Sequence, residues 1–305
     1  MLGIYKSPLM NHYIFLKETD LNQQNIIKLL LTKNIRIDIR DEQNRSVLYS
    51  VIKFSYLPIL LLFLTKDTEI IGKSILEIKD NDDNIPIFYA IKFFNIEAIN
   101  IIFRFQPSYY AKNSDGENAL HLSIKSMDLN IFKLINTKIT DINIKKNNGE
   151  SCLHLAIKYK CYDILKHILT AYKDTINLNA TESKYNFSPL HYIFITNDYQ
   201  LITIFEPYFE HMNGNIQDKS GNIFLHYFIN NIVNTANANA TENVNTNTNK
   251  TDILDTINVI SNKLNFNYNL SNIDSDTACH VLLNHLNTVK SSYNVIIQLL
   301  IEKNH

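Results

Sequence analysis

Residues 115–123 read DGENALHLS, and residues 148–156 repeat the pattern as NGESCLHLA. Five other segments carry weaker versions of the same phrase. The histidine position recurs in steps of 39, 33, 33, 37, 35 and 54 residues, at Tyr49, Phe88, His121, His154, His191, His226 and His280. A repeat of this period decides the architecture, because each unit is one supersecondary element that stacks on its neighbours.

The longest step contains a low-complexity insertion. Residues 234–251 are rich in Asn, Thr and Ala and poor in charged and large apolar side chains. Such a segment cannot offset its ordering entropy, so it predicts a disordered loop that interrupts a unit. The sequence predicts one array over residues 1–305 of about eight units. Its expected parts are a degenerate N-terminal unit (1–40), central units (41–233), the insertion (234–251) and a C-terminal unit (252–305).

The unit that begins near Asn113 shows how each repeat folds. Asp115-Gly116 is a tight-turn signal, because Gly adopts positive φ without a steric penalty. Apolar residues at helical spacing follow in two short segments, 120–124 and 129–135. Helices this short bury too little surface alone, so stacking must complete the core. The expected fold class is all-α, a solenoid of stacked helix-turn-helix units with short extended turn tips. Further second helices are expected at 96–105, 162–169, 201–209, 253–264 and 295–301.

The repeated phrase resembles a known family motif. Residues 188–191 read Ser-Pro-Leu-His, which is similar to the Thr-Pro-Leu-His-x-Ala opening of ankyrin repeats, a family with units of about 33 residues. The resemblance covers nearly the whole chain, although the motif is degraded at 46–49, 85–88 and 277–280. It implies an ankyrin-repeat solenoid that binds protein partners on its concave helix faces and turn tips.

Composition limits the partners and the compartment. The net charge of −1 gives no global attraction to nucleic acid or to an anionic membrane. The most apolar run, residues 57–64, is far shorter than the roughly 20 residues of a membrane span, and no secretory signal is evident. The three cysteines form no CxxC pair and fit a reducing compartment. We therefore expect a monomeric cytoplasmic or nuclear protein without a membrane span.

The regularly spaced histidines invite a catalytic or metal-binding interpretation. Stacked units hold successive histidines on the order of 10 Å apart, whereas zinc ligands lie about 2.0 to 2.3 Å from one ion. The imidazole at this position can instead satisfy backbone groups at the start of the helix. The sequence contains none of the usual phosphate-loop, HExxH or GxSxG motifs. We predict no metal, no cofactor and no enzymatic activity.

A lysine column marks the candidate site. Four consecutive units carry Ile-Lys at the end of the first helix, and the next residue is Phe, Phe, Ser or Tyr. By resemblance to ankyrin repeats, these positions and the turn residues line the concave face. The candidates are Arg45, Lys53, Phe54, Asn84, Lys92, Phe93, Glu117, Lys125, Ser126, Glu150, Lys158 and Tyr159. The column predicts binding of an acidic or phosphorylated segment.

We call Lys53, Lys92, Lys125 and Lys158 the lysine ladder. Other interpretations of this ladder remain open. Lys at a helix C-terminus also complements the helix dipole and solvates the surface, and Glu117 and Glu150 could pair with the lysines and weaken their field. The predicted function is a non-enzymatic protein-interaction module, acting as adaptor, scaffold or inhibitor, with a protein partner of unknown identity. One alternative is the regulatory ankyrin subunit of a larger enzyme complex. Another is nucleic-acid or acidic-surface binding through the lysines, against which the neutral overall charge argues.

Overall fold

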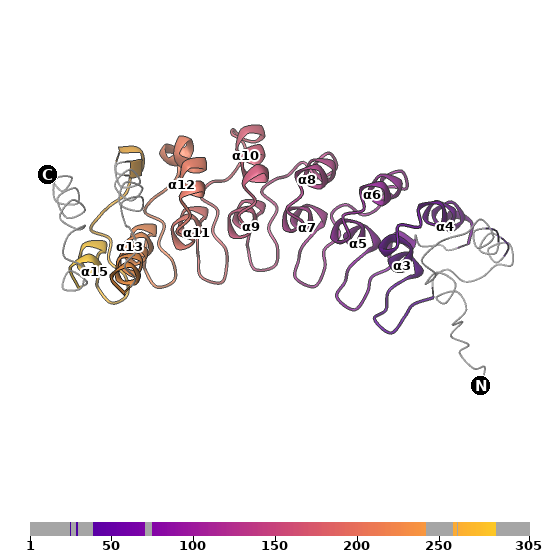
Figure 1. Cartoon of the computed structure of the whole chain (residues 1–305), viewed down its shortest axis with the longest axis horizontal. Coiled ribbons are helices and arrows are strands. Elements are labelled where there is room, and N and C mark those ends of the chain that lie inside the picture. Colours follow the sequence, from indigo (N-terminus) through magenta and orange to yellow (C-terminus); the bar gives the residue numbers. More distant parts are fainter. Residues whose placement is uncertain are drawn as a thin grey trace. The chain divides into compact units, whose positions relative to one another are not determined.

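The structure is a computed structural model that describes residues 39–70, 75–241, 259–260 and 262–284, together with residues 25 and 29. The described residues form helices and isolated bridges without a strand, so the predicted all-α class is confirmed. The chain divides into two compact units, Met1–Asp141 and Ile142–His305. The first unit contains α3 (Val47–Lys53), α4 (Leu57–Ile70), the 3-10 helix η1 (Ile75–Glu77), α5 (Pro86–Lys92), α6 (Ile96–Phe103), α7 (Ala119–Lys125) and α8 (Leu129–Asn136) (Figure 1). The second contains α9 (Cys152–Lys158), α10 (Tyr162–Ala171), α11 (Pro189–Ile195), α12 (Tyr199–Phe205), the 3-10 helix η2 (Glu206–His211), α13 (Phe224–Thr241) and α15 (Ala278–Asn284).

Each unit is a two-layer stack of short helices. In the first unit α3, α5 and α7 pack side by side, and α4 packs beside α6 behind them. In the second unit α9, α11, α13 and α15 form the corresponding row, with α10 beside α12. The core between the layers is aliphatic and aromatic, and it includes fully buried residues such as Leu48, Phe63, Phe132 and Phe194. Stacking buries the apolar faces that the short helices cannot cover alone.

The turns before the first helix of each repeat share one pattern of side-chain to backbone hydrogen bonds. The carboxylate of Asp41 accepts hydrogen bonds from the backbone N–H groups of Gln43 and Arg45, and Asn113 and Asp218 do the same in their repeats. Asp and Asn suit this position because their short side chains bond the backbone two residues ahead. The turns then pass through a left-handed residue, which Gly149 supplies at φ 82°.

Successive turn tips are joined by backbone hydrogen bonds. In the first unit Ser114 N–H donates to the Asp82 carbonyl at 3.0 Å. In the second unit Ser183 N–H donates to the Asn148 carbonyl at 2.7 Å. These bonds fix the spacing of adjacent repeats within each unit at the tips, where a solvated loop would otherwise move freely.

In each described repeat, a second residue with a left-handed backbone conformation connects the two helices, and this residue is never glycine. Positive φ between 49° and 59° occurs at Ser55, Phe94, Met127, Lys160 and Asn197. Residues other than Gly and Asn are strained in this backbone conformation. Phe94 and Met127 are the two large apolar residues among them, and both are exposed, at 57% and 59%.

Helix ends differ from the sequence prediction by a few residues. α6 ends at Phe103 rather than at residue 105, and α10 continues to Ala171 rather than 169. α12 ends at Phe205, four residues before the predicted end, and η2 follows. Pro207 explains this end, because proline has no N–H to donate to the preceding turn of an α-helix.

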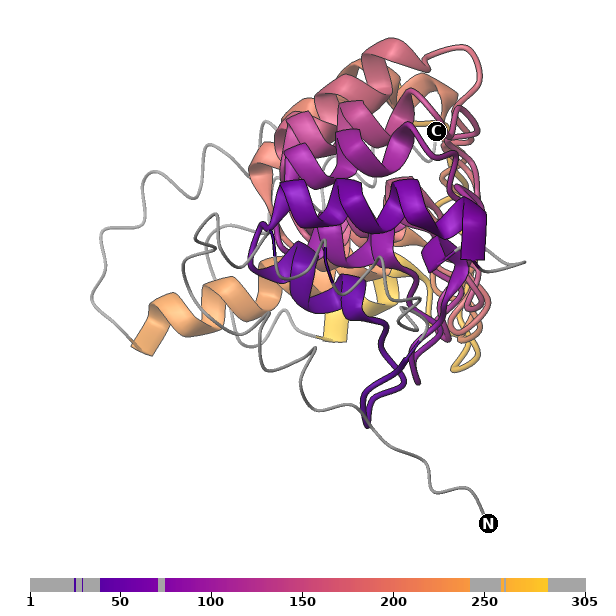
Figure 2. The same ribbon diagram turned by 90° about the vertical axis from the view of Figure 1, so that its right-hand side faces the viewer.

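The insertion is not a loop from its first residue. α13 continues as a regular helix to Thr241 (Figure 2, orange), so the expectation of disorder is wrong for residues 234–241. A nucleated helix extends at little cost, and the alanines at 236, 238 and 240 favour it. Residues 242–251, most of the expected N-terminal unit at 1–40 and the expected helix at 295–301 lie outside the described residues. None of the helices in the described part of the chain combines the length and apolar character needed to cross a membrane.

Candidate partner-binding surface

The four ladder lysines occupy equivalent places. Lys53, Lys92, Lys125 and Lys158 are the last residues of α3, α5, α7 and α9. Each therefore complements the dipole at the C-terminus of its helix, as one of the two sequence-based interpretations requires. Because all four share this role, the dipole does not distinguish among them, and their other contacts decide how they differ.

Lys125 is paired within its own repeat. Its ammonium group contacts both carboxylate oxygens of Glu117, at 2.9 and 3.0 Å. The Glu117 side chain is 2% exposed, so its charge is screened little by solvent and requires a cation nearby. Lys125 thus neutralises a buried acid and adds little free positive charge to the surface.

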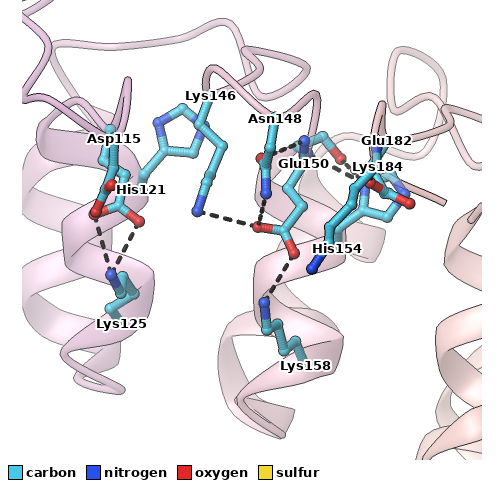
Figure 3. Close-up of polar contacts among 12 residues, drawn as sticks. Asp115, His121, Lys125, Lys146, Asn148, Glu150, His154, Lys158, Glu182 and Lys184 are labelled. Carbon is cyan, nitrogen blue, oxygen red and sulfur yellow. Dashed lines mark hydrogen bonds and ion pairs between the residues drawn. The ribbon is translucent and has the colours of Figure 1, made fainter. Parts of the chain in front are cut away.

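Lys158 is compensated in the same way in the second unit. Glu150 accepts from Lys158 at 2.9 Å and pairs with Lys146 at 3.1 Å (Figure 3). The Tyr192 hydroxyl also donates to Glu150, at 3.0 Å. Burial alone raises the pKa of Glu150, but the hydrogen bonds from Asn148, Lys158 and Lys146 outweigh it and lower the pKa to about 2. Glu150 is therefore ionised, and it compensates the positive charges of Lys146 and Lys158.

Lys53 and Lys92 have no acidic partner among the residues that the structure describes. Both side chains are exposed. The Lys53 ammonium lies 5.8 Å from the Tyr49 ring centre and 5.5 Å from the Phe54 ring centre, within cation–π range. The ladder therefore divides into two compensated lysines and two that present their charge to solvent.

Aromatic rings flank the uncompensated lysines. The ring centre of Tyr49 is 4.8 Å from that of Tyr89 and 5.7 Å from that of Phe93, both in edge-on geometry. The Arg45 guanidinium stacks 3.8 Å from the Tyr49 ring centre while it also pairs with Asp41 at 2.6 Å. This packing fixes Tyr49 and Phe93 as partly exposed, rigid surface beside Lys53 and Lys92.

The structure also forms a pocket of about 330 Å³ between α5 and α7. Four predicted site residues line it: Asn84, Lys92, Lys125 and Ser126. Sequence reasoning missed Phe94, which forms part of the wall. The available signal was the pair of consecutive aromatics after Lys92, where the other ladder units have at most one.

The remaining predicted residues have other surroundings. Phe54 and Phe93 are half-buried, and Ser126 donates its hydroxyl to the Ser123 carbonyl at 2.7 Å. Tyr159 follows α9 and is 36% exposed. Glu117 and Glu150 lie in the turns as expected, but both are buried and face their lysines. They cannot contact a partner directly in this arrangement.

The histidines act within the fold. The ring Nδ1 of His154 accepts from the Ser151 N–H, and Nε2 lies 3.1 Å from the Phe187 carbonyl of the next repeat, to which it donates in the matching tautomer. His191 makes the same bridge to Asn222 at 3.2 Å. Burial lowers the pKa of His154 to about 4, so the ring is neutral near pH 7. No cluster of metal-ligating side chains occurs within the described ranges.

These features define the class of protein: a solenoid of helix-turn-helix repeats, joined at the turn tips and bridged by buried histidines. Residues 87–182 match the family model of ankyrin repeats, in three copies. The chain is an ankyrin-repeat protein, as its sequence predicts. Ankyrin repeats indicate a module of protein–protein interaction.

Two comparisons show how far the similarity extends. An ankyrin repeat protein of Acanthamoeba polyphaga mimivirus is 30% identical over 209 residues, a match that covers 68% of this chain. The chain spans only 27% of the length of that relative. The crystal structure of the ankyrin repeat domain of Bcl-3, a member of the IkappaB protein family, matches with a TM-score of 0.59 at 16% identity, over 79% of this chain and 97% of that domain. At this identity the second match shows the fold alone.

Proposed function

We propose that the chain is a non-enzymatic adaptor or inhibitor of the cytoplasm or nucleus that binds an acidic or phosphorylated segment of a protein partner. One observation carries the proposal. Lys53 and Lys92 are exposed beside aromatic rings without an acidic partner in the described part of the chain, whereas Lys125 and Lys158 neutralise buried acids. We therefore assign the positive charge that binds the partner to Lys53 and Lys92.

Physical chemistry favours an anionic segment at these lysines. A carboxylate or phosphate can accept charge-assisted hydrogen bonds from them without first breaking an internal ion pair. The neighbouring rings are already held by edge-on contacts, so little side-chain entropy is lost on binding. At Lys125 and Lys158 the same anion would compete with buried Glu117 and Glu150, which carry like charge.

Affinity capture followed by mass spectrometry tests the proposal. The double variant Lys53→Glu/Lys92→Glu is compared with wild type and with Lys133→Glu/Lys166→Glu. The control lysines are exposed on α8 and α10, in the second layer, and their replacement changes the net charge equally. Circular dichroism of each variant verifies that helicity is retained.

The proposal expects a partner that is lost with the ladder variant and kept with the control. A partner that is kept with both variants contradicts the assignment to Lys53 and Lys92. An enzyme recovered in equimolar amount would make the chain a regulatory subunit of a larger complex. Loss with both variants would show that net charge, rather than the ladder position, controls binding.

A further inference from the structure

The pocket between α5 and α7 combines an apolar wall with a polar rim. Phe88, Phe94 and Leu122 contribute apolar surface, and Asn84, Asn113 and Ser126 contribute polar groups. Its volume of about 330 Å³ lies at the low end of the range of small ligand sites, about 300–1,000 Å³. The pocket therefore has room for one large side chain rather than for an extended stretch of polypeptide.

The left-handed linker recurs in every described repeat, but Phe94 is the one aromatic residue among the five at this position, Ser55, Phe94, Met127, Lys160 and Asn197. The φ of Phe94, 54°, is left-handed, where a bulky side chain is strained. The ring is 57% exposed, so burial offsets little of this strain. The equivalent residues of the second unit are Lys160, which is strained in the same way, and Asn197, which tolerates this backbone. Phe94 thus places an aromatic ring at the pocket edge at a cost to stability.

The charge of the pocket determines which kind of ligand it favours. Two cations line the pocket, Lys92 and Lys125. Lys125 is neutralised by Glu117 at 2.9 Å, whereas Lys92 ends α5 without an ion pair to any residue in the described ranges. The pocket therefore carries one uncompensated positive charge beside apolar surface. Its complement is an apolar side chain next to a carboxylate.

We infer that this pocket receives one aromatic side chain of an acidic peptide segment, whose neighbouring carboxylate pairs with Lys92 while the ring packs against Phe94. The inference rests on the proposed function and makes it specific: the partner carries an aromatic anchor flanked by Asp or Glu. Lys53, which lies outside the pocket lining, adds only long-range attraction.

The chain contains no tryptophan, so a tryptophan in a probe reports insertion without background. The probe is a nine-residue peptide with one central tryptophan and glutamate elsewhere, titrated with the full chain while its emission is recorded. We expect a blue shift on saturation, because the indole leaves water for the apolar pocket. Two matched peptides, one with glutamine for glutamate and one with glycine for tryptophan and a terminal dye, separate the charge from the anchor.

Four variants test whether the probe binds in the pocket. Phe94→Asn removes the wall and suits the left-handed backbone, so it should keep or increase stability while it weakens probe binding about fivefold. Met127→Asn makes the same change at the equivalent linker residue outside the pocket lining and should leave binding unchanged. Lys92→Gln should weaken binding about fivefold and reduce its salt dependence, whereas Lys133→Gln on α8 should do neither.

Each contrary outcome has a distinct meaning. Absence of saturation by about 1 mM probe, or binding without a blue shift, overturns the pocket assignment. Equal losses in Phe94→Asn and Met127→Asn overturn it too and assign the anchor to the linker tips. In these cases the capture experiment with the ladder variant still tests the proposed function, because it does not depend on the anchor.

Discussion

His154 links protonation to stability at the scale of one residue. Its buried ring accepts at Nδ1 and bridges to the Phe187 carbonyl through Nε2, which requires the neutral form. Burial lowers its pKa to about 4, whereas an unfolded histidine titrates near 6.5. The unfolded chain therefore binds more protons between these values, and this contribution to stability is present above pH 6.5 and lost as the pH falls towards 4.

We expect His154→Asn to lower the free energy of unfolding by about 1–2 kcal/mol at pH 7. Between pH 7 and 5 its stability should fall less steeply than that of the wild type, because the titrating group is gone. Urea unfolding at several pH values measures both effects. His211→Asn is the control, since His211 is exposed. Equal pH slopes for wild type and His154→Asn would contradict this account.

The left-handed residues give a second test at this scale. Gly149 has φ 82°, and a Cβ there would lie 2.6 Å from Ser183 Oγ and 2.9 Å from Ser183 N. Gly149→Ala should therefore lower the free energy of unfolding by about 2 kcal/mol. Met127→Asn should instead leave it unchanged or raise it by up to about 1 kcal/mol, because Asn tolerates φ near 59° and the methionine is largely exposed. Thermal and urea unfolding would refute the interpretation if both changes had the same sign.

At the scale of elements, a turn and the helix that follows it are joined by an acid and two lysines. Glu150 precedes α9 and pairs with Lys158 at the end of that helix and with Lys146 in the turn. Glu150→Gln leaves both ammonium groups without their counterion, so we expect it to lower the free energy of unfolding by about 1–3 kcal/mol. The loss should shrink as the pH falls from 4.5 towards 2, because over this range the unfolded wild-type chain binds a proton at Glu150 that the folded chain does not.

Glu206→Gln is the matched control for this prediction. The pair of Glu206 with Lys263 has a similar distance, 2.9 Å, but both side chains are more than a third exposed, Glu206 at 35% and Lys263 at 46%. A solvated pair of this kind contributes less than about 1 kcal/mol. Chemical unfolding that shows equal losses for both variants would mean that burial of Glu150 does not strengthen its pairing.

The elements themselves were largely predictable, and the pocket was not. The repeat phase placed each lysine at a helix end and each acid in the preceding turn, so pairing of Lys125 and Lys158 could be anticipated from spacing alone. Helix ends depend on local details such as Pro207, and they differed by a few residues. The pocket depends on the packing of α7 beside α5 and on the side chains that the two repeats contribute together, which the sequence of one repeat does not predict.

At the scale of the whole molecule, the single array over residues 1–305 stays a prediction, and the contacts within the chain group it into two compact units, Met1–Asp141 and Ile142–His305. Repeat proteins are stabilised by their own helices and by interfaces with adjacent repeats. A local perturbation therefore spreads only as far as those interfaces are strong. Hydrogen exchange can measure that range along this chain.

We expect Gly149→Ala to accelerate amide exchange in residues 142–241 and to leave residues 75–141 unchanged. The reciprocal variant is Asn95→Ala, which removes the cap of α6 and a 3.0 Å hydrogen bond to the Ile52 carbonyl. It should accelerate exchange before residue 141 and not after it. Mass spectrometry of peptides on both sides of this position reads the result directly. Acceleration on both sides by either variant would show that the array unfolds as one cooperative body, and a perturbation at one repeat would then reach a partner bound at another.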